Sequence, residues 1–345
     1  MGSPASIHHP CAAETAESAV TASEFAALVS GCGLFPLSSR AQISLSGKDR
    51  MRWLNGMITN KVRDLPLGEG VYAFVLNAQG HILGDLYAYN RGESLLVDSD
   101  ESQSAKLLEI FRRHIIMDAV RIANLEGQWT AIGIAGPKVG DVLRTAQFTF
   151  QELRPLQLVD GAWQKLPLSL ARSDNPAVES YQIWIAPEQA GLLREALTSA
   201  GATAVGPAAL ELLRIACGIP RYGQDIRERD LPQETEQLRA LNFEKGCYIG
   251  QEIVERIRSR GKVHRKFTGF EVMGSLPVPG ERIHCEGKEV GEVTSSAALP
   301  VAGGNQPVAL GYIRREAAAT EQPLQAGEAR LRVVELPFMA AIPQR

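Results

Sequence analysis

The hydrophobic pattern of this chain changes in kind after Gly261, and this change limits the folds that it can adopt. Beyond Gly261, short runs rich in β-branched and aromatic residues alternate with turns rich in Gly and Pro. Such a pattern is typical of a small antiparallel barrel, in which each strand is followed by a tight reversal. The predicted strands are residues 267–272, 282–285, 289–294, 308–313 and 329–334.

Before Gly261, strand-like and helix-like periodicities alternate, which predicts mixed α+β layers. Two β-rich runs, residues 71–76 and 81–89, are joined by Asn77-Ala78-Gln79-Gly80, a sequence that favours a hairpin turn. Helical spacing of apolar residues appears from Ser23 and again in residues 103–113, 138–146, 187–200 and 207–225. Neither a G-x-G-x-x-G motif nor a P-loop occurs, so the sequence does not support a nucleotide-cofactor fold.

The chain length of 345 residues predicts two or three domains. We expect a disordered tail over residues 1–22, an α+β region over 23–260 and a barrel domain over 261–345. The tail is rich in Ala, Ser, Thr and Glu, contains no Lys or Arg, and carries Glu14 and Glu17. These features fit neither a mitochondrial presequence nor a secretory signal, so we expect a cytoplasmic protein.

The charge and hydropathy of the chain exclude several broad classes of partner. The formal net charge is -3, and no apolar run approaches the roughly 20 residues that a membrane span needs. A basic cluster over residues 256–266 lacks interleaved aromatic residues, which argues against RNA binding and favours a solvated helix end. We therefore expect neither nucleic acid nor membrane as a partner.

The five cysteines argue against a disulfide framework and against a metal centre. They are odd in number, widely spaced and never arranged as C-x-x-C. This spacing fits neither a structural zinc site nor a self-contained iron–sulfur cluster. The nearest sets of potential metal ligands are His8-His9 with Cys11 and His284-Cys285, and we expect neither to bind a metal.

One cysteine nevertheless lies in an unusual octapeptide, residues 245–252 with the sequence KGCYIGQE. Cys247 follows a cation, Lys245, and precedes a predicted helix, and both features favour the reactive thiolate. Gly246 and Gly250 permit backbone conformations that larger residues resist. The alternative, equally open on physical grounds, is a buried and inert cysteine in a tight connector.

The octapeptide, which also contains Tyr248, Gln251 and Glu252, closely resembles the signature of the YgfZ-type folate-binding proteins. These proteins are relatives of the glycine-cleavage T-protein, an aminomethyltransferase, and are linked to the assembly or repair of iron–sulfur proteins. Similarity extends over most of residues 24–338. It implies a ring of two α+β subdomains and a C-terminal antiparallel β-barrel, with tetrahydrofolate in a central channel. Iron–sulfur assembly factors or client proteins are the partners that the resemblance implies.

The resemblance also implies a set of folate-binding residues. Met57 lies in a stretch similar to the family's opening motif, and Tyr222 and Asp225 lie in a segment whose acid holds the pterin ring. Asp85 shares a strand face with Leu83 and Tyr87, and it corresponds to one of two adjacent acids that contact folate in T-protein-like sequences. The other position is Gly84, which puts aminomethyl transfer in doubt. For Asp85 a solvated strand face, and for Asp225 a capping or turn role in a polar loop, remain the alternatives. For the basic cluster over residues 256–266, electrostatic capture of the glutamate tail of a folate is an alternative to a solvated helix end.

Three functions follow from these observations. The first is a folate-binding accessory factor for iron–sulfur proteins, in which Cys247 is a redox-active or sulfur-handling thiol, Lys245 lowers its pKa, and Gln251 and Glu252 fix the loop. The second is a folate-dependent aminomethyltransferase or a related one-carbon enzyme. The third is a scaffold without cysteine chemistry. The sequence leaves open whether the chain catalyses a reaction.

Overall fold

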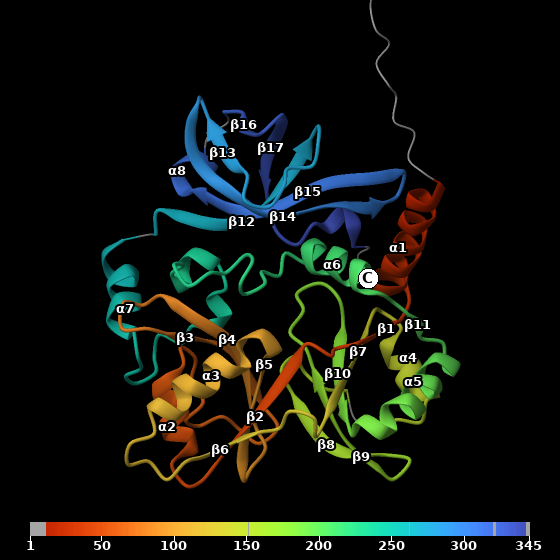
Figure 1. Cartoon of the computed structure of the whole chain (residues 1–345), viewed down its shortest axis with the longest axis vertical. Coiled ribbons are helices and arrows are strands. Elements are labelled where there is room, and N and C mark those ends of the chain that lie inside the picture. Colours follow the sequence, from red (N-terminus) through yellow and green to blue (C-terminus); the bar gives the residue numbers. More distant parts are fainter. Residues whose placement is uncertain (1–11, 151, 262, 320–321, 343–345) are drawn as a thin grey trace, which may run out of the picture.

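A computed structural model describes residues 12–150, 152–261, 263–319 and 322–342. Two α+β subdomains lie side by side, and a closed barrel lies across one end of both (Figure 1). The predicted fold class, two α+β subdomains followed by an antiparallel barrel, is therefore confirmed. Within the described ranges, every helix is too short or too polar to span the apolar core of a bilayer.

The first subdomain is built on a five-stranded antiparallel sheet with the order β3-β4-β5-β2-β6. One face of the sheet is covered by α2 (Arg50–Met57) and α3 (Glu101–Arg113), where Trp53, Leu107 and Phe111 are buried. Part of the other face is covered by the chain segment 226–254, and its remainder is open to a cavity described below. The strands are β2 (Arg40–Ser46), β3 (Gly70–Leu76), β4 (Ile82–Asn90), β5 (Ser94–Asp100) and β6 (Arg121–Asn124).

The second subdomain contains a six-stranded sheet in the order β11-β1-β7-β10-β9-β8. Apolar residues of α4 (Val139–Thr145) and α5 (Ala190–Ser199) cover one face, and those of α1 (Ala12–Ser30) and α6 (Pro207–Ala216) cover the other. The α1–α6 layer also packs against barrel residues, so one core joins the two parts. The strands are β1 (Gly33–Pro36), β7 (Thr130–Ala135), β8 (Leu158–Trp163), β9 (Leu166–Arg172), β10 (Ser180–Ile185) and β11 (Thr203–Ala204).

The N-terminal helix is longer than the sequence predicts. It begins at Ala12 instead of Ser23, so residues 12–22 are helical where a disordered tail was expected. The added segment is rich in Ala and Glu, which have high intrinsic helix propensity, and its continuation docks on α6 through Phe25 and Leu28. Residues 1–11, including His8, His9 and Cys11, lie outside the described residues.

The barrel closes with the strand order β12-β15-β14-β13-β16-β17. Five of these strands coincide with predicted segments, whereas β16 was not predicted because three residues give no readable alternation. Between the barrel and the sheets, α6 ends at Ala216, well before the predicted residue 225, because Gly218 takes φ +67° and Pro220 follows. The strands are β12 (Arg265–Met273), β13 (Arg282–Cys285), β14 (Lys288–Val301), β15 (Gly304–Arg314), β16 (Leu324–Ala326) and β17 (Ala329–Val334).

A buried carboxylate joins the barrel to the rest of the chain. Asp225 is 0% exposed, and its Oδ2 accepts hydrogen bonds from Arg214 Nη1 at 2.7 Å and from the Arg221 backbone N–H at 2.9 Å. Its Oδ1 accepts from the hydroxyls of Thr294 at 2.5 Å and Ser295 at 2.8 Å, both on β14. These four donors saturate the acceptor capacity of one carboxylate.

We predict that Asp225→Ala destabilises the protein strongly, because it leaves the guanidinium of Arg214 buried beside two hydroxyls that lose their acceptor. Breaking a buried ion pair from one side costs about 3 kcal/mol or more in unfolding free energy. Urea unfolding of the full chain measures the change. Asp141→Ala is the matched control, because the Asp141 carboxylate is 73% exposed and its pair with Arg144 is solvated. Equal stability of the two variants would contradict a joining role for Asp225.

Candidate functional site

A cavity of about 610 Å³ lies where the barrel meets both subdomains, and we call it the interdomain cavity. The barrel contributes Phe267 from β12, and the segment 333–337 contributes the end of β17 and the three residues after it. Asp174 comes from the β9–β10 loop, and Arg239 comes from a short 3-10 helix, Leu238–Ala240. Its volume lies in the range of roughly 300–1,000 Å³ that is typical of small-molecule sites.

A smaller hollow of about 170 Å³, the side pocket, extends from it toward the first sheet. Ile219 and Arg239 line both hollows, so the two meet at these residues. The side pocket is walled by β4, β5 and α3 on one side and by the loop after α6 on the other. Asp85 and Tyr222, two of the four residues predicted to bind folate, both line it.

Asp85 presents a carboxylate that is held in place by neutral donors. The Tyr72 hydroxyl donates to Oδ2 at 2.7 Å, and Gln103 Nε2 donates to Oδ1 at 2.8 Å. Gln103 Oε1 also accepts from the Asp85 backbone N–H at 2.9 Å, which fixes the amide orientation. Burial and the nearby carboxylate raise the pKa of Tyr72, so the phenol remains a donor. Each carboxylate oxygen keeps acceptor capacity for a further N–H group.

Tyr222 forms the opposite wall of the side pocket. Its hydroxyl donates to the Leu83 carbonyl at 2.7 Å and accepts from Lys106 Nζ at 3.0 Å. The same ammonium is paired with Glu228 at 2.7 Å. Tyr222 is therefore fixed between β4 and α3, and its role is to shape the pocket.

The cationic part of this wall could not be predicted from the sequence pattern. The guanidinium of Arg239 lies 4.3 Å from the centroid of the Tyr72 ring and pairs with Asp174. Asp174 also accepts from the Tyr87 hydroxyl at 3.2 Å, and Tyr87 stands directly opposite Tyr72 in the β3–β4 register. The hairpin pattern predicts that Tyr87 shares a face with Asp85, but only the tertiary fold brings Asp174 and Arg239 to it.

Two of the predicted folate ligands do not lie at the site. Met57 is 4% exposed and packs in the core between α2 and the first sheet, as its helical spacing alone would place it. Asp225 is saturated by protein donors at the barrel junction, so it has no acceptor left for an aminopterin edge. The turn-capping alternative agrees in part with the structure, because Oδ2 accepts the Arg221 backbone N–H of the same loop, but the side chain is also buried and paired with Arg214.

Lys245 of the octapeptide has a structural role. Its Nζ is buried and donates to three backbone carbonyls, those of Asn55 and Ile58 at 2.6 Å and of Asn60 at 2.8 Å. Burial lowers the pKa of Lys245 to about 7, while the three acceptors at the carboxyl end of α2 oppose that shift. All three N–H donors of the ammonium are used, so the proposed support of the Cys247 thiolate by Lys245 has no basis in this geometry.

Cys247 itself is exposed, which excludes the alternative of a buried, inert cysteine. It does not belong to the described residues that line the interdomain cavity or the side pocket. The cysteines at positions 32, 217 and 285 are buried, and burial raises the pKa of Cys32 and of Cys217 to about 12. Among these four thiols, Cys247 is the accessible one.

The remaining octapeptide residues fix the loop around Cys247. Gly250 has φ +83° and caps α7 (Gln251–Arg260), and a Cβ there would lie 2.6 Å from the Asn77 carbonyl of the β3–β4 turn. Gln251 Oε1 accepts from the Tyr248 N–H at 3.3 Å, and Tyr248 is buried against Lys245. Gly246 has open space around it, and Glu252 is exposed in the first turn of α7. The sequence therefore predicts the need for glycine correctly at Gly250 but not at Gly246.

A short chain of hydrogen bonds connects the octapeptide to the cavity wall. Asn60, whose carbonyl accepts from Lys245, donates through Nδ2 to the Arg239 carbonyl at 2.8 Å and to the Tyr72 carbonyl at 2.9 Å. Arg239 and Tyr72 are wall residues of the side pocket. Within the part of the chain that the structure describes, no group of three His, Cys, Asp or Glu residues could hold a metal ion.

Comparisons with known proteins agree with this architecture. A family model described as the GCVT N-terminal domain matches residues 4–245, and one described as the glycine cleavage T-protein C-terminal barrel domain matches residues 265–339. The chain is 29% identical over 332 residues to an aminomethyltransferase of Rubrobacter xylanophilus, covering 91% of this chain and 85% of that protein. For an aminomethyltransferase of Nostoc sp., the identity is 28% over 316 residues, covering 88% and 82%.

Among solved structures, the glycine cleavage system aminomethyltransferase T from Bartonella henselae has the same fold. The TM-score is 0.82, and the match covers 93% of this chain and 90% of that chain. At 22% sequence identity this likeness concerns the fold alone.

We predict that substitutions of Lys245 and Cys247 have very different effects on the free energy of unfolding. Lys245→Met leaves three carbonyls at the end of α2 without donors. Each hydrogen bond to a charged group contributes about 1.5–3 kcal/mol, but burying the ammonium offsets part of that gain, so we expect a net loss of about 3 kcal/mol in unfolding free energy. Cys247→Ala removes an exposed thiol and changes little. Urea unfolding of both variants checks this, and a stable Lys245→Met protein would contradict the structural role.

Proposed function

The chain belongs to the glycine cleavage T-protein family, and from this premise we propose that it binds tetrahydrofolate in the interdomain cavity and its side pocket. We further propose that it is an accessory factor for the assembly or repair of iron–sulfur proteins, as in the YgfZ-type branch. In that role the exposed thiol of Cys247 handles sulfur, a cluster or an oxidant. Folate and iron–sulfur client or assembly proteins are then its partners.

The chemistry of the cavity supports a folate. A pterin ring offers flat apolar faces and an edge with adjacent N–H donors, and the site offers the rings of Tyr72, Tyr87 and Phe267 together with carboxylate acceptors. Arg239 provides a cation on the wall between the two hollows. Bound there, tetrahydrofolate would supply a one-carbon carrier or a reductant, and the residues of the chain would bind and orient it.

The single observation that carries the folate proposal is the state of Asp85. Its two side-chain partners are neutral, both are fixed, and both oxygens keep acceptor capacity. Such a carboxylate is ready to accept parallel N–H groups from an aminopterin edge.

The neighbouring position on β4, Gly84, faces away from the cavity. A Cβ at Gly84 would lie 3.0 Å from Gln103 Oε1 and 3.1 Å from Leu107 Cδ2, on the face of β4 that packs against α3. The cavity face of β4 therefore offers one acid, Asp85, while position 84 faces α3. The absence of an acid at position 84 leaves the cavity lining unchanged, so the choice between the two roles rests on Cys247 and on the activity test below.

The geometry of Cys247 supports a surface reaction with a protein partner. The thiol is exposed on a loop that Lys245, Gly250 and Gln251 hold in place, beside the N-terminus of α7. An accessible, rigidly presented thiol is suited to reversible oxidation or to transfer between proteins.

The second candidate function is folate-dependent aminomethyl transfer, and the identity of the relatives favours it. The relatives of R. xylanophilus and Nostoc sp. are both aminomethyltransferases, and each alignment covers most of both chains. This function would use the same folate site but would assign no chemistry to Cys247.

We predict that Asp85→Asn lowers the affinity for tetrahydrofolate about ten- to a hundredfold, because a charge-assisted pair of hydrogen bonds is lost. Calorimetric titration of the full chain measures this affinity. Met57→Leu and Asp160→Asn are the controls and should bind as wild type does, since Met57 is a core residue and Asp160 lies on β8, away from the cavity. Wild-type affinity in Asp85→Asn would remove Asp85 from the site.

We predict that Cys247→Ser folds and binds tetrahydrofolate as wild type does but fails to restore iron–sulfur enzyme activity in cells that lack the protein. Cys285→Ala, which alters a buried barrel thiol, should restore it. Full rescue by Cys247→Ser would refute the thiol role. Incubation with an aminomethyl-loaded carrier protein and tetrahydrofolate separates the two candidates, since methylenetetrahydrofolate above background would favour the aminomethyltransferase.

A further inference from the structure

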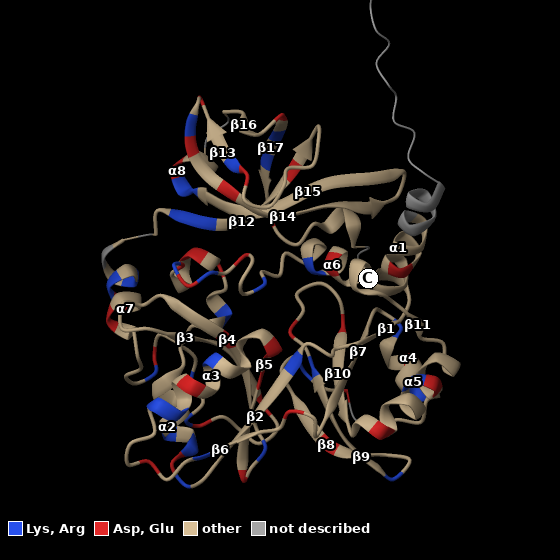
Figure 2. Cartoon of the chain, in the orientation of Figure 1, with Lys and Arg blue, Asp and Glu red and all other residues tan. Residues whose placement is uncertain are grey.

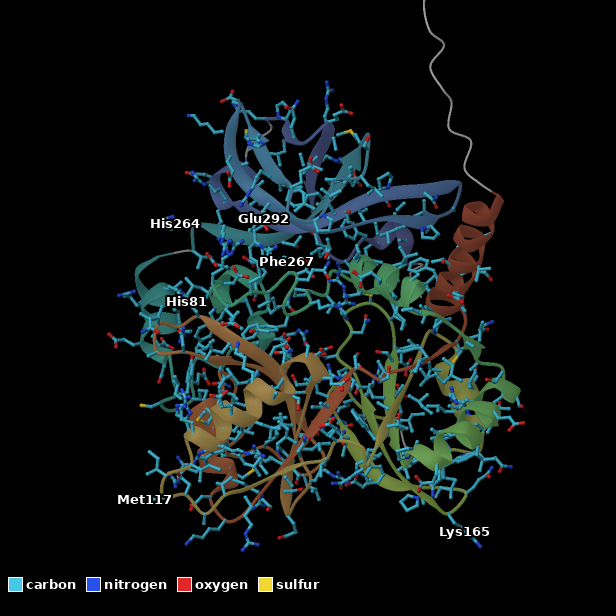
Figure 3. The ribbon with its side chains drawn as sticks, in the orientation of Figure 1. His81, Met117, Lys165, His264, Phe267 and Glu292 are labelled. Atoms are coloured by element: carbon cyan, nitrogen blue, oxygen red, sulfur yellow. The ribbon has the colours of Figure 1, made fainter. Side chains whose placement is uncertain are left out.

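A separate cavity of about 370 Å³ lies at the edge of the barrel, and we call it the arginine pocket. Four arginines line it, Arg229 from the loop before the barrel and Arg265, Arg282 and Arg314 from β12, β13 and β15. In Figure 2 the start of β12 is blue, which marks its Lys and Arg residues. In Figure 3 the label of Glu292 lies at the base of the barrel. The folate proposal uses none of these arginines.

One arginine of the arginine pocket has no acidic partner. The lining holds four arginines and two acids, Glu289 and Glu292, and Asp230 and Glu234 pair with Arg265 from outside the lining. Glu292 already binds Arg229 at 2.9 Å and Arg282 at 3.1 Å. Arg314 is exposed, and the described part of the chain gives it no carboxylate partner within ion-pair distance. One guanidinium is thus left with its donors free at the rim.

The strand register places two of these cations face to face. Arg265 of β12 is paired directly with Arg314 of β15, and like charges directly opposite on neighbouring strands repel. Asp230 at 2.6 Å and Glu234 at 2.9 Å compensate Arg265 from below. Neither acid is in contact with Arg314, so Arg314 is the cation of this pair that a bound anion would compensate.

An unused donor at the same pocket points to a ligand independently. Tyr312 is 4% exposed, and its hydroxyl has no hydrogen-bond partner although it is buried. Burial and the nearby carboxylates of Asp230 and Glu234 raise the pKa of Tyr312, so the hydroxyl keeps its proton. The ring is fixed by Phe267, with centroids 5.5 Å apart, and by the Arg265 guanidinium at 4.8 Å. A buried hydroxyl without a partner destabilises a fold, and such groups are retained where a function uses them.

We propose that the arginine pocket binds an oxyanion, a phosphate or carboxylate group, between the guanidiniums of Arg265 and Arg314 and the hydroxyl of Tyr312. Arginine forks match the planar or tetrahedral oxygens of such groups. The phenol adds a third donor from the floor of the pocket. Recognition requires no movement of the barrel, because all three residues lie on the paired strands β12 and β15.

Two sources can supply this chemistry. One is free phosphate from solvent. The other, which rests on the proposed function, is a carboxylate on the glutamate tail of a bound folate. Phe267 lines the interdomain cavity and packs on Tyr312, which lines the arginine pocket, so one aromatic pair forms the wall between the two.

The test uses inorganic phosphate and the full chain without folate. Thermal unfolding midpoints are measured against phosphate concentration, with chloride at equal ionic strength and pH as the reference. We expect the wild-type midpoint to rise with phosphate, because a ligand that binds only the native state stabilises it. For Arg314→Gln we expect an apparent Kd about tenfold higher, through loss of one charged fork.

Tyr312→Phe separates binding from folding. Its midpoint in chloride should equal or exceed that of wild type, because the unpaired hydroxyl is gone, while its response to phosphate should shrink. Arg330→Gln, an exposed arginine on β17 outside the pocket, should respond as wild type does. No difference between phosphate and chloride, or equal responses of Arg314→Gln, Tyr312→Phe and Arg330→Gln, would overturn the proposal.

A second experiment decides whether the anion is free phosphate or the folate tail, and it does not affect the interpretation of the phosphate experiment. Calorimetry compares tetrahydrofolate carrying one glutamate with the form carrying several. A gain in affinity from the longer tail that Arg314→Gln abolishes assigns the site to the folate tail. Equal affinities together with phosphate binding assign it to free phosphate. The phosphate experiment contains no folate. Its result therefore tests the arginine pocket whether or not the protein binds folate.

Discussion

The arrangement of the three parts depends on one buried carboxylate. Asp225 accepts hydrogen bonds from α6, from its own loop and from β14. It therefore fixes the barrel relative to the helix that covers the second sheet. Arg214, held by Asp225 and Glu211, also lines the side pocket. Burial alone would lower the pKa of Arg214, but these two carboxylates outweigh it and raise the pKa. The wall of the site is therefore set by the same ion pair that positions the barrel.

The octapeptide extends this logic to the first subdomain. Lys245 holds the loop at the end of α2 and donates to the Asn60 carbonyl. The Asn60 side chain in turn donates to the carbonyls of Arg239 and Tyr72 on the cavity wall. Cys247 is carried on the same loop but faces solvent. One motif thus combines a residue that builds the cavity with a residue that is free to react outside it. The link gives a physical route by which an occupied cavity and the thiol loop would influence each other.

The sequence predicts those features that depend on local periodicity and turn chemistry. The β3–β4 hairpin, the helices over α3 to α5 and five barrel strands follow from alternation, helical spacing and glycine turns. Side-chain roles were less predictable, because spacing does not reveal the partner of a polar group. Met57 obeys its helical stripe and is buried, and Asp225 meets donors that lie 11 and about 70 residues away in the chain. Asp85 was predictable because its strand face follows from alternation alone.

Asp85 and Asp225 show how partners, more than burial, decide what an acid does in this fold. Asp225 has a guanidinium and three further donors, so its charge and its lone pairs are both satisfied, and removing a donor costs stability. Asp85 has two neutral donors, which orient the carboxylate without neutralising its charge. Its two oxygens keep acceptor capacity that the N–H groups of a ligand can use. The same reasoning applies with opposite sign at the arginine pocket, where Arg314 and Tyr312 are donors without acceptors. Binding sites in this molecule are thus expected where the internal pairing of polar groups is incomplete.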